Sequence, residues 1–305
     1  MAVSSEEARV DKTVQRLVRA LKGINAELRS IVSEVAVATS TSSTYWNGVA
    51  SRIRRQYEAA RIVTREWTKA AIPKEYTARL ADAIRQMKAT TFTPNKVNIQ
   101  DVVNKNGVKQ SANTVVNDAY SSFLKGLMLG QNNLLRLSSV TQQVVLSEAK
   151  VNKSIAEGYI EQGSAQASKV ALRDALLQKA IDGKYITVVD KNGAERSYEV
   201  DSYAELVART KLIDAATTAT IDTAREVGAD LVQVSSHNTL CDVCKEFEGK
   251  IYSLSGQDSD FPQLEDEPPY HPNCMHSLTI VYREALEADG SLDDYISRSN
   301  EGVSA

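Results

Sequence analysis

The sequence predicts an α+β protein, mainly helical over its first two thirds and closed by a small α+β domain that a metal ion holds together. Three observations lead to this fold class: a long apolar heptad pattern near the start, an Asn-Gly hairpin signal near residue 190, and one segment that contains every Cys and His. We expect five regions in chain order: helical residues 1–89, a linker at 90–107, helical residues 108–183, an α+β domain at 184–290 and a tail at 291–305.

Residues 6–38 carry the clearest helical period. Apolar side chains recur there at alternating steps of four and three, which is the seam of a coiled coil. The pattern fits two structures equally well: a helix that pairs with another copy of the chain, or an amphipathic helix of an ordinary bundle. The seam consists of Val10, Val14, Leu17, Leu21, Ile24, Leu28, Ile31 and Val35.

Further helices follow the Ser/Thr-rich break at residues 39–44. A second helix begins near Trp46 and is predicted to end at Pro73, and a third continues to Met87. Beyond the predicted linker, the apolar spacing indicates four more helices, the last of them capped by Ser164 and closed by Gly183. These four are expected at 112–130, 139–149, 153–162 and 164–181.

The last third begins with a β-hairpin at residues 185–200, in which Asn192-Gly193 separates two alternating apolar runs. Ser202 and Glu205 form a predicted capping box for a helix that ends at Gly228. Three short strands are expected after this helix, at 231–234, 249–254 and 277–282.

The segment from His237 to His276 contains all three cysteines and all three histidines of the chain. Cys241 and Cys244 form a C-x2-C turn, which holds two thiolates at the separation of neighbouring vertices of a zinc tetrahedron. The run from His271 to Cys274 forms a second such turn, stiffened by Pro272 and with Asn273 suited to a left-handed backbone. The sequence therefore predicts one zinc ion bound between two turns.

We take Cys241, Cys244, His271 and Cys274 as the ligand set, with His276 as the alternate fourth ligand. The competing interpretation is three ordinary buried thiols, or one disulfide and a spare thiol. Paired Cys and His turns in an intracellular chain more often bind metal, and an odd number of thiols fits a Cys3His site better than a disulfide set.

The zinc is expected to be structural, and the chain is not expected to be an enzyme. A catalytic zinc keeps an open coordination position beside a general acid or base, and the motifs H-x-E and H-E-x-x-H are absent. The alternative from another class is a metal-dependent nuclease of the ββα type. It would have to recruit His237 and Asp242, whose spacing does not favour it.

Four features follow one another in the C-terminal module: the run from Asp230 to His237, the C-x2-C turn, the strand that begins at Gly249-Lys250, and the ending from Pro268 to His276. In these features the module resembles that of phage minor head proteins, the Mu F-like head morphogenesis and minor capsid family. The preceding helix is similar as well, so about residues 200–283 are covered. Many relatives have Cys at position 276, which keeps His276 in the candidate ligand set.

The resemblance implies a structural protein of the phage head interior. Such a protein would bind the portal oligomer, contact other head proteins and packaged DNA, and assist head assembly and DNA packaging or ejection. We expect it in the host cytoplasm during assembly and then in the virion. The polar start of the chain carries no signal-peptide pattern, and no apolar run approaches a transmembrane length.

The charge distribution is uneven. Lys and Arg predominate in the first hundred residues, whereas Asp and Glu dominate after Cys241. The helix containing Arg52 to Lys69 could contact DNA phosphates. A solvated face with acidic partners is the favoured interpretation, because charge runs on helices are usually solvated. The acidic loop between Gly256 and Pro269 could contact a basic partner or a second cation, although most such loops are simply solvated.

Overall fold

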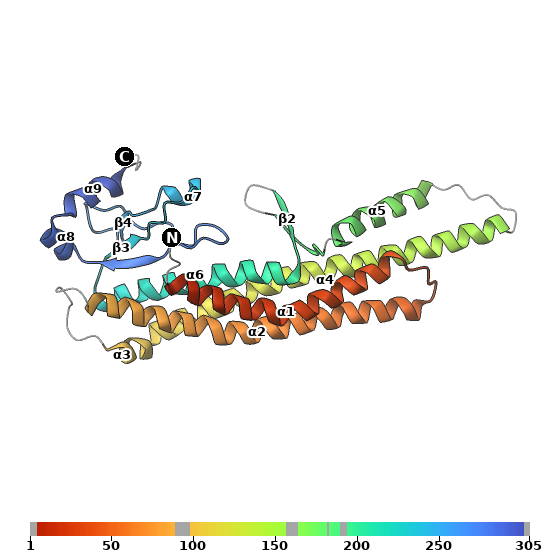
Figure 1. Cartoon of the computed structure of the whole chain (residues 1–305), viewed down its shortest axis with the longest axis horizontal. Helices are drawn as coiled ribbons and strands as arrows, with labels where there is room; N and C mark the ends of the chain where they lie inside the picture. Colours follow the sequence, from red (N-terminus) through yellow and green to blue (C-terminus); the bar gives the residue numbers. More distant parts are fainter. Residues whose placement is uncertain (1–4, 89–97, 157–163, 182, 190–193, 302–305) are drawn as a thin grey trace. The chain divides into compact units, whose positions relative to one another are not determined.

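The computed structural model describes residues 5–88, 98–156, 164–181, 183–189 and 194–301, and helices predominate (Figure 1). The helices are α1 Ser5–Ala36, α2 Ser43–Lys88, α3 Ile99–Asn104, α4 Asn106–Ala156, α5 Ser164–Ile181, α6 Val200–Val227, α7 Asp242–Lys245, α8 Arg283–Asp289 and α9 Leu292–Asn300. The strands are β1 Ile186–Val189, β2 Glu195–Tyr198, β3 Leu231–Val234, β4 Ile251–Ser253 and β5 Leu278–Val281. The α+β class with a mainly helical N-terminal part is thus confirmed.

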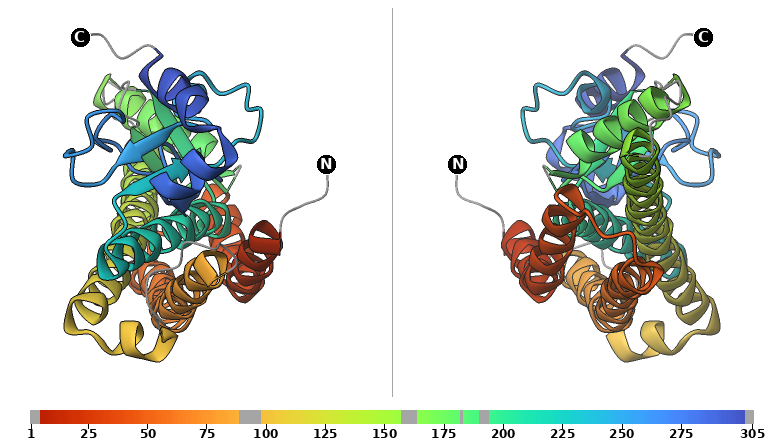
Figure 2. Two further views of the ribbon diagram at one scale, coloured as in Figure 1. Left: turned by 90° about the vertical axis from the view of Figure 1, so that its left-hand side faces the viewer. Right: turned by 90° about the vertical axis from the view of Figure 1, so that its right-hand side faces the viewer.

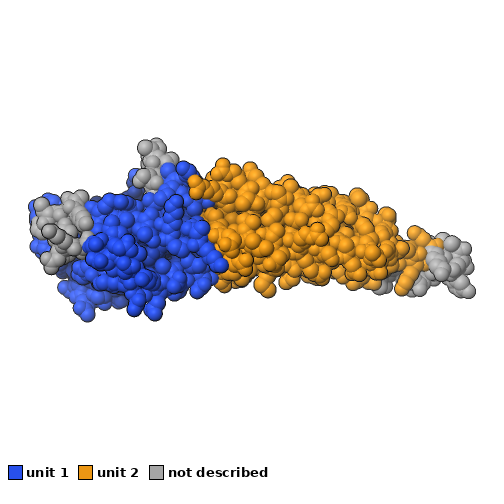
Figure 3. Space-filling view, turned by 90° about the horizontal axis from the view of Figure 1, so that it is seen from below, with its two compact units in different colours: residues 1–13, 68–119, 206–305 blue, residues 14–67, 120–205 orange. Residues whose placement is uncertain are grey.

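The chain forms two compact units (Figure 3). Unit 1 contains residues 1–13, 68–119 and 206–305, and unit 2 contains residues 14–67 and 120–205. Each unit is described below by its own packing.

Unit 2 is a helical bundle in which α1 and α2 lie side by side (Figures 1 and 2). Arg52 of α2 links the two helices through ion pairs with Glu27 and Glu34 of α1. Leu21 and Leu28, in the middle of the heptad seam, are fully buried within the chain. The seam therefore packs in the protein's own core, as expected for an amphipathic helix of a bundle.

The predicted helix end at Pro73 is wrong, because α2 continues through this proline to Lys88. A proline inside a helix removes one hydrogen bond and costs about 3 kcal/mol. Packing within unit 1 offsets that cost: Ile72 and Tyr76 are buried on either side of Pro73, and the Tyr76 hydroxyl donates to Asp222 of α6. Tertiary contacts thus outweigh the local signal.

The predicted helices 112–130 and 139–149 are one helix, α4. The predicted gap at residues 131–138 is helical, and its polar side chains bond to other parts of unit 2. Asn133 Nδ2 donates to the Tyr185 carbonyl at 2.9 Å, and Gln131 Oε1 accepts from Arg61 of α2. Part of the predicted helix 153–162 lies outside the described residues. The predicted bounds of α5 match the structure. The cap predicted at Ser164 involves a side chain that lies outside the described part of the chain.

The predicted hairpin forms as the antiparallel pair β1–β2, in which Ile186 faces Tyr198. Its Asn192-Gly193 turn lies outside the described residues. The capping box predicted for α6 is wrong, because the helix begins at Val200, two residues before Ser202. The backbone carbonyl of Glu199 accepts the N–H of Tyr203 at 2.9 Å, so the helical hydrogen bonds begin before Ser202. Gly183 follows α5 with a φ of 77°, as its predicted role at the helix end requires.

Unit 1 contains a three-stranded antiparallel sheet of order β4-β3-β5, covered on both faces. Alternate residues of β3 point to opposite faces. Val232 and Val234 pack with Ile221 and Ala224 of α6, whereas Leu231 packs with Phe261 and the residues of α8 and α9. The sheet is therefore the middle of three layers.

Arg79 of α2 connects the helices of unit 1 to this sheet. Its side chain is buried, its Nε donates to Thr220 Oγ1 of α6 at 3.0 Å, and Nη2 donates to the carbonyl of Leu278 in β5. At the start of the chain, Arg9 binds Glu75 at 2.7 Å and Asp82 at 3.2 Å. The Arg79 contacts thus join α2 to the sheet, and the Arg9 contacts join α1 to α2.

Over the described residues, every helix is too short or too polar to span a bilayer.

Candidate metal centre

The first turn of the site is built on α7, the single helical turn that follows Cys241. The backbone N–H groups of Cys244 and Lys245 donate to the Cys241 carbonyl at 3.1 and 2.9 Å. This one turn of helix brings the Cys241 and Cys244 thiols to the same side. Cys244 is buried and Cys241 is half-buried.

The second turn runs from His271 to Cys274. The Cys274 N–H donates to the His271 carbonyl at 3.0 Å, which closes the turn. Asn273 has a φ of 64°, so the predicted left-handed conformation is confirmed. Its N–H reaches Thr210 Oγ1 of α6 at 3.5 Å, so the turn rests on the helix.

The two turns face each other. The Nε2 atom of His271 lies 3.4 Å from Cys241 Sγ and 3.0 Å from Cys244 Sγ, and Cys244 Sγ lies 3.9 Å from Cys274 Sγ. A zinc ion bonded at about 2.3 Å to sulfur and about 2.0 Å to nitrogen separates its tetrahedral ligand atoms by about 3.5–3.8 Å. The observed separations are close to these edges, so the cluster could hold a metal ion.

Five side chains contribute to this cluster, as two overlapping groups that share Cys244. One group adds Cys241 and His271, and the other adds Cys274 and His276. Within each group the donor atoms all lie within 4.8 Å of one another. All three cysteines are free, so the alternative of a disulfide and a spare thiol is not what the structure contains.

Both histidines present an available nitrogen to the sulfurs. His271 Nδ1 lies 2.8 Å from the Pro272 carbonyl and donates to it, which leaves the lone pair of Nε2 facing Cys241 and Cys244. His276 Nε2 lies 2.9 Å from Glu248 Oε1 and donates to it, which leaves Nδ1 facing Cys274 Sγ at 3.4 Å. The choice between the two as fourth ligand therefore stays a prediction.

Glu248 is the functional residue that the sequence did not reveal. Its half-buried carboxylate accepts the N–H of His237 at 2.9 Å and that of Thr239 at 3.2 Å, besides the ring N–H of His276. One carboxylate thus joins the chain before the first turn to the chain after the second. A carboxylate that orients an imidazole is a common outer partner of zinc sites. The only sequence signal was an acidic residue between the C-x2-C turn and Gly249, which is too common to single out.

The electrostatics of the site follow from burial and these contacts. Burial raises the pKa of Cys244, and the neighbouring Cys274 raises it further. Burial would raise the pKa of Cys274 too, but when His276 is protonated on both nitrogens its Nδ1–H donates to the Cys274 thiolate, and this hydrogen bond outweighs burial and lowers the pKa. The Cys241 pKa is lowered by N–H groups of α7, first that of Cys244. A bound cation would favour the thiolate form of all three.

His237 lies outside both donor groups. Its Nε2 bonds to Ser235 Oγ at 2.8 Å, and its ring packs edge-on against that of His276 at 4.8 Å between centroids. His237 is therefore a polar residue just past β3. Asp242, the other residue of the nuclease hypothesis, is exposed on α7 and belongs to neither donor group.

Part of the acidic loop is neutralised within the chain. Arg283 pairs with Asp258 at 2.7 Å and with Asp260 at 2.9 Å, and its guanidinium lies 5.6 Å from the centroid of the Phe261 ring. Glu265 and Asp266 are exposed. The Arg283 contacts hold the loop against α8.

The fold and the site together define a helical protein that carries a small module with a candidate metal centre. The chain matches the family model described as phage minor capsid protein 2 over residues 7–286, and it belongs to this family. The match extends through the N-terminal helices, beyond the C-terminal module that carries the sequence resemblance. Comparisons with curated proteins and with solved structures give no significant match. Membership supports a structural role in the capsid and association with the virion.

Proposed function

We propose that this chain is a structural minor head protein that binds the portal inside the phage head and assists head assembly and DNA packaging or ejection. The observation that carries the proposal is the family match over residues 7–286, which includes both the helical part and the Cys/His module. The helices of the N-terminal two thirds are the proposed portal-binding part, and the C-terminal module is a compact unit that one metal ion stabilises.

The proposed metal is zinc. Three thiols and an imidazole form a donor set that favours zinc over calcium or magnesium, which prefer oxygen ligands. A set of four protein donors leaves no open position, and this is typical of a structural site. Zinc bound there would neutralise the thiolates and hold the turn at Cys241–Cys244 against the turn at His271–Cys274.

The portal contact is tested by co-expression with the ring-forming portal protein of the same operon. The intact chain should co-purify with the ring in a fixed ratio. A Cys241→Ser/Cys244→Ser variant should still bind the ring, because the proposed contact belongs to the helices. Failure of the intact chain to associate, together with normal heads formed in its absence, would refute the proposed role.

A contact with packaged DNA is a separate part of the proposal. In the described part of the chain, Arg52 and Arg61 bind acidic side chains, whereas Arg54 and Arg55 are exposed and make no ion pair. With Lys69, which is also exposed and has no ion pair in the described residues, they are the cations of this helix segment that remain for phosphates. Arg54→Glu/Arg55→Glu should reduce the salt dependence of duplex binding, and no binding at low salt would favour the solvated-face interpretation.

The nuclease hypothesis gains no specific support. A ββα nuclease needs a histidine base beside a metal-binding acid, whereas His237 is bonded to Ser235. Plasmid cleavage with Mg²⁺ or Mn²⁺ tests it: we expect no cutting. Cutting that His237→Ala abolishes would overturn the structural role in favour of catalysis.

A further inference from the structure

One face of α1 is basic and carries no acidic side chain in the part of the helix that belongs to unit 2, residues 14–36. A solvated helix face typically alternates the two signs of charge. Here every charged side chain among the exposed residues is a cation. The exposed residues are Gln15, Arg16, Arg19, Ala20, Lys22, Gly23, Ala26, Arg29, Ser30 and Ser33. The face therefore suits an anionic partner.

The two carboxylates of this part of α1 are engaged elsewhere. Glu27 and Glu34 both pair with Arg52 of α2, Glu27 at 2.9 Å. On the exposed face, Arg29 binds Glu199. The remaining cations of the face, which make no ion pair in the described part of the chain, are Arg16, Arg19 and Lys22. These three are available for a charge from outside the chain.

Arg16, Arg19 and Lys22 form a compact row. They are three residues apart, so the first and the last are separated by about 9 Å along the helix axis and lie within about a third of its circumference. Duplex DNA carries one phosphate charge for about every 1.7 Å of its axis, so a stretch of about 9 Å presents about five charges. Arginine also binds phosphate through two parallel hydrogen bonds. The three side chains can therefore contact neighbouring phosphates at the same time.

Small residues next to these cations leave room for a close approach. A Cβ atom added at Gly23 would meet no atom within 4 Å, so packing within the chain does not require a glycine there. A glycine inside a helix nevertheless costs about 1 kcal/mol relative to alanine. Ala20 and Ala26, about one turn to either side, are exposed as well. The surface beside the cations is thus low enough for a rigid polymer to lie along the helix.

The composition of this face favours a nucleic acid over a protein as the partner. The centre of a protein–protein interface usually contains large apolar or aromatic side chains. The exposed residues of α1 between positions 14 and 36 include none of these. Interfaces with DNA are instead polar and positively charged, and contacts to phosphates need no apolar anchor.

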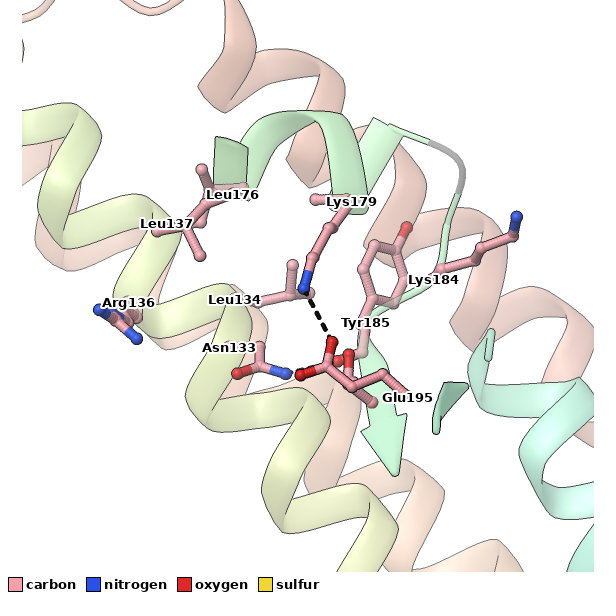
Figure 4. A pocket seen from close by; sticks show the side chains of 11 residues that line it. Asn133, Leu134, Arg136, Leu137, Leu176, Lys179, Lys184, Tyr185 and Glu195 are labelled. Atoms are coloured by element: carbon pink, nitrogen blue, oxygen red, sulfur yellow. Dashed lines mark hydrogen bonds and ion pairs between the residues drawn. The ribbon is translucent and has the colours of Figure 1, made fainter. Parts of the chain in front are cut away.

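Unit 2 has a second basic group, at the pocket between α4, α5 and the hairpin (Figure 4). Arg136, Lys179 and Lys184 line this pocket together with Glu195. Lys179 lies 3.3 Å from the Glu195 carboxylate, so an acidic side chain already stands among these cations and would repel a phosphate. The face of α1 has no such carboxylate, and the pocket group provides a matched control.

We propose that Arg16, Arg19 and Lys22 on the exposed face of α1 bind the phosphate backbone of duplex DNA without reading its sequence. Phosphate contacts fix the position of a protein on DNA but carry no direct sequence information. The inference rests on the proposed contact with packaged DNA, and it assigns to α1 a part of that contact which Arg54 and Arg55 of α2 do not supply.

Fluorescence anisotropy with a labelled random-sequence duplex tests the proposal on the full chain, between about 50 and 200 mM salt. Arg19→Gln/Lys22→Gln should make the plot of log affinity against log salt shallower by about 1.8, which is about 0.9 for each phosphate contact removed. The affinity lost should be the same for duplexes of different sequence. Glutamine keeps the helix propensity of arginine and lysine, so α1 should stay folded.

Arg136→Gln/Lys184→Gln is the matched control. It also replaces one arginine and one lysine of unit 2, and both are exposed and make no ion pair in the described part of the chain. Its salt dependence should equal that of the intact chain. An equal change in both variants would show a diffuse attraction to total charge and overturn the proposal. Far-UV circular dichroism and zinc content equal to those of the intact chain show that each variant is folded.

The variant Arg54→Glu/Arg55→Glu separates this inference from the proposed function. If the intact chain binds DNA and only this variant of α2 weakens the binding, the inference about α1 is wrong and the proposed DNA contact stands. If the intact chain does not bind duplex at low salt, both are wrong. If Arg19→Gln/Lys22→Gln loses binding to an acidic head protein but keeps its affinity for DNA, the face of α1 binds protein and the inference is wrong.

Discussion

Gly126 of α4 lies where the ring of Tyr203 packs against the helix within unit 2. A Cβ atom added at Gly126 would lie 2.0 Å from Tyr203 Cε1 and 2.3 Å from Cζ, far inside van der Waals contact. The ring cannot move freely, because it is buried and its hydroxyl donates to the Ser122 carbonyl at 2.9 Å. We therefore expect Gly126→Ala to destabilise the bundle.

The magnitude follows from three contributions. Overpacking of a buried site costs about 1–3 kcal/mol, and loss of the hydrogen bond from Tyr203 costs about 1 kcal/mol more. Replacing a helical glycine with alanine stabilises the helix by about 1 kcal/mol. The free energy of unfolding should therefore fall by about 1–3 kcal/mol, the overpacking range once the other two contributions cancel.

Urea unfolding followed by far-UV circular dichroism measures this change. The matched control is Gly48→Ala in α2 of the same unit, where an added Cβ meets no atom within 4 Å. That substitution should raise the free energy of unfolding by about 0.5–1 kcal/mol. In a double-mutant cycle, Tyr203→Leu should remove most of the penalty at Gly126. Equal effects at Gly126 and Gly48 would refute the close packing of α4 against Tyr203.

Three further predictions concern the metal site, the seam and the acidic loop. Glu248→Ala should weaken zinc binding by about 10- to 100-fold in chelator competition, with a smaller loss for Glu248→Gln, and equal affinities would exclude a positioning role for this carboxylate. Leu21→Asp should lower the free energy of unfolding by at least about 3 kcal/mol, because it buries a charge, and an unchanged melting curve would contradict the buried seam. Burial opposes ionisation of Asp258, but the hydrogen bond from Arg283 outweighs it and lowers the pKa below its ordinary 3.8. Above pH 3.8 the intact chain should thus have a higher free energy of unfolding than Asp258→Asn, and this difference should disappear as the pH falls through the lowered pKa. A difference that is independent of pH would contradict the Asp258–Arg283 pair.

The sequence predicted the features that depend on local pattern. The heptad seam of α1, the hairpin pair and the strand at Leu231–Val234 are where alternation and helical period placed them. The turn at Asn273 also follows from local chemistry, because asparagine tolerates a left-handed backbone. In each case the buried face and the backbone preference agree.

Features that depend on distant residues could not be predicted. The helix through Pro73 is stabilised by burial of its neighbours and by Asp222, which lies 149 residues later in the chain. Glu248 gained its role only when folding brought it to His276. Arg79 resembled any helical cation, yet it is buried and bonded to α6 and β5. No local period encodes such contacts.

The most direct test of the account is removal of the metal. The purified chain should contain one zinc ion, and Cys241→Ser, Cys244→Ser and Cys274→Ser should each abolish its binding. His271→Ala and His276→Ala should differ sharply in zinc retained, which identifies the fourth ligand. A structural zinc contributes on the order of 10 kcal/mol to folding.

Hydrogen exchange after chelation gives the decisive measurement. Protection should be lost over residues 230–283, which contain the sheet and both turns, while α1, α2 and α4 keep theirs. Re-addition of zinc should restore it. A chain without zinc, or a C-terminal module whose protection survives chelation unchanged, would contradict the claim that one metal ion holds this module together.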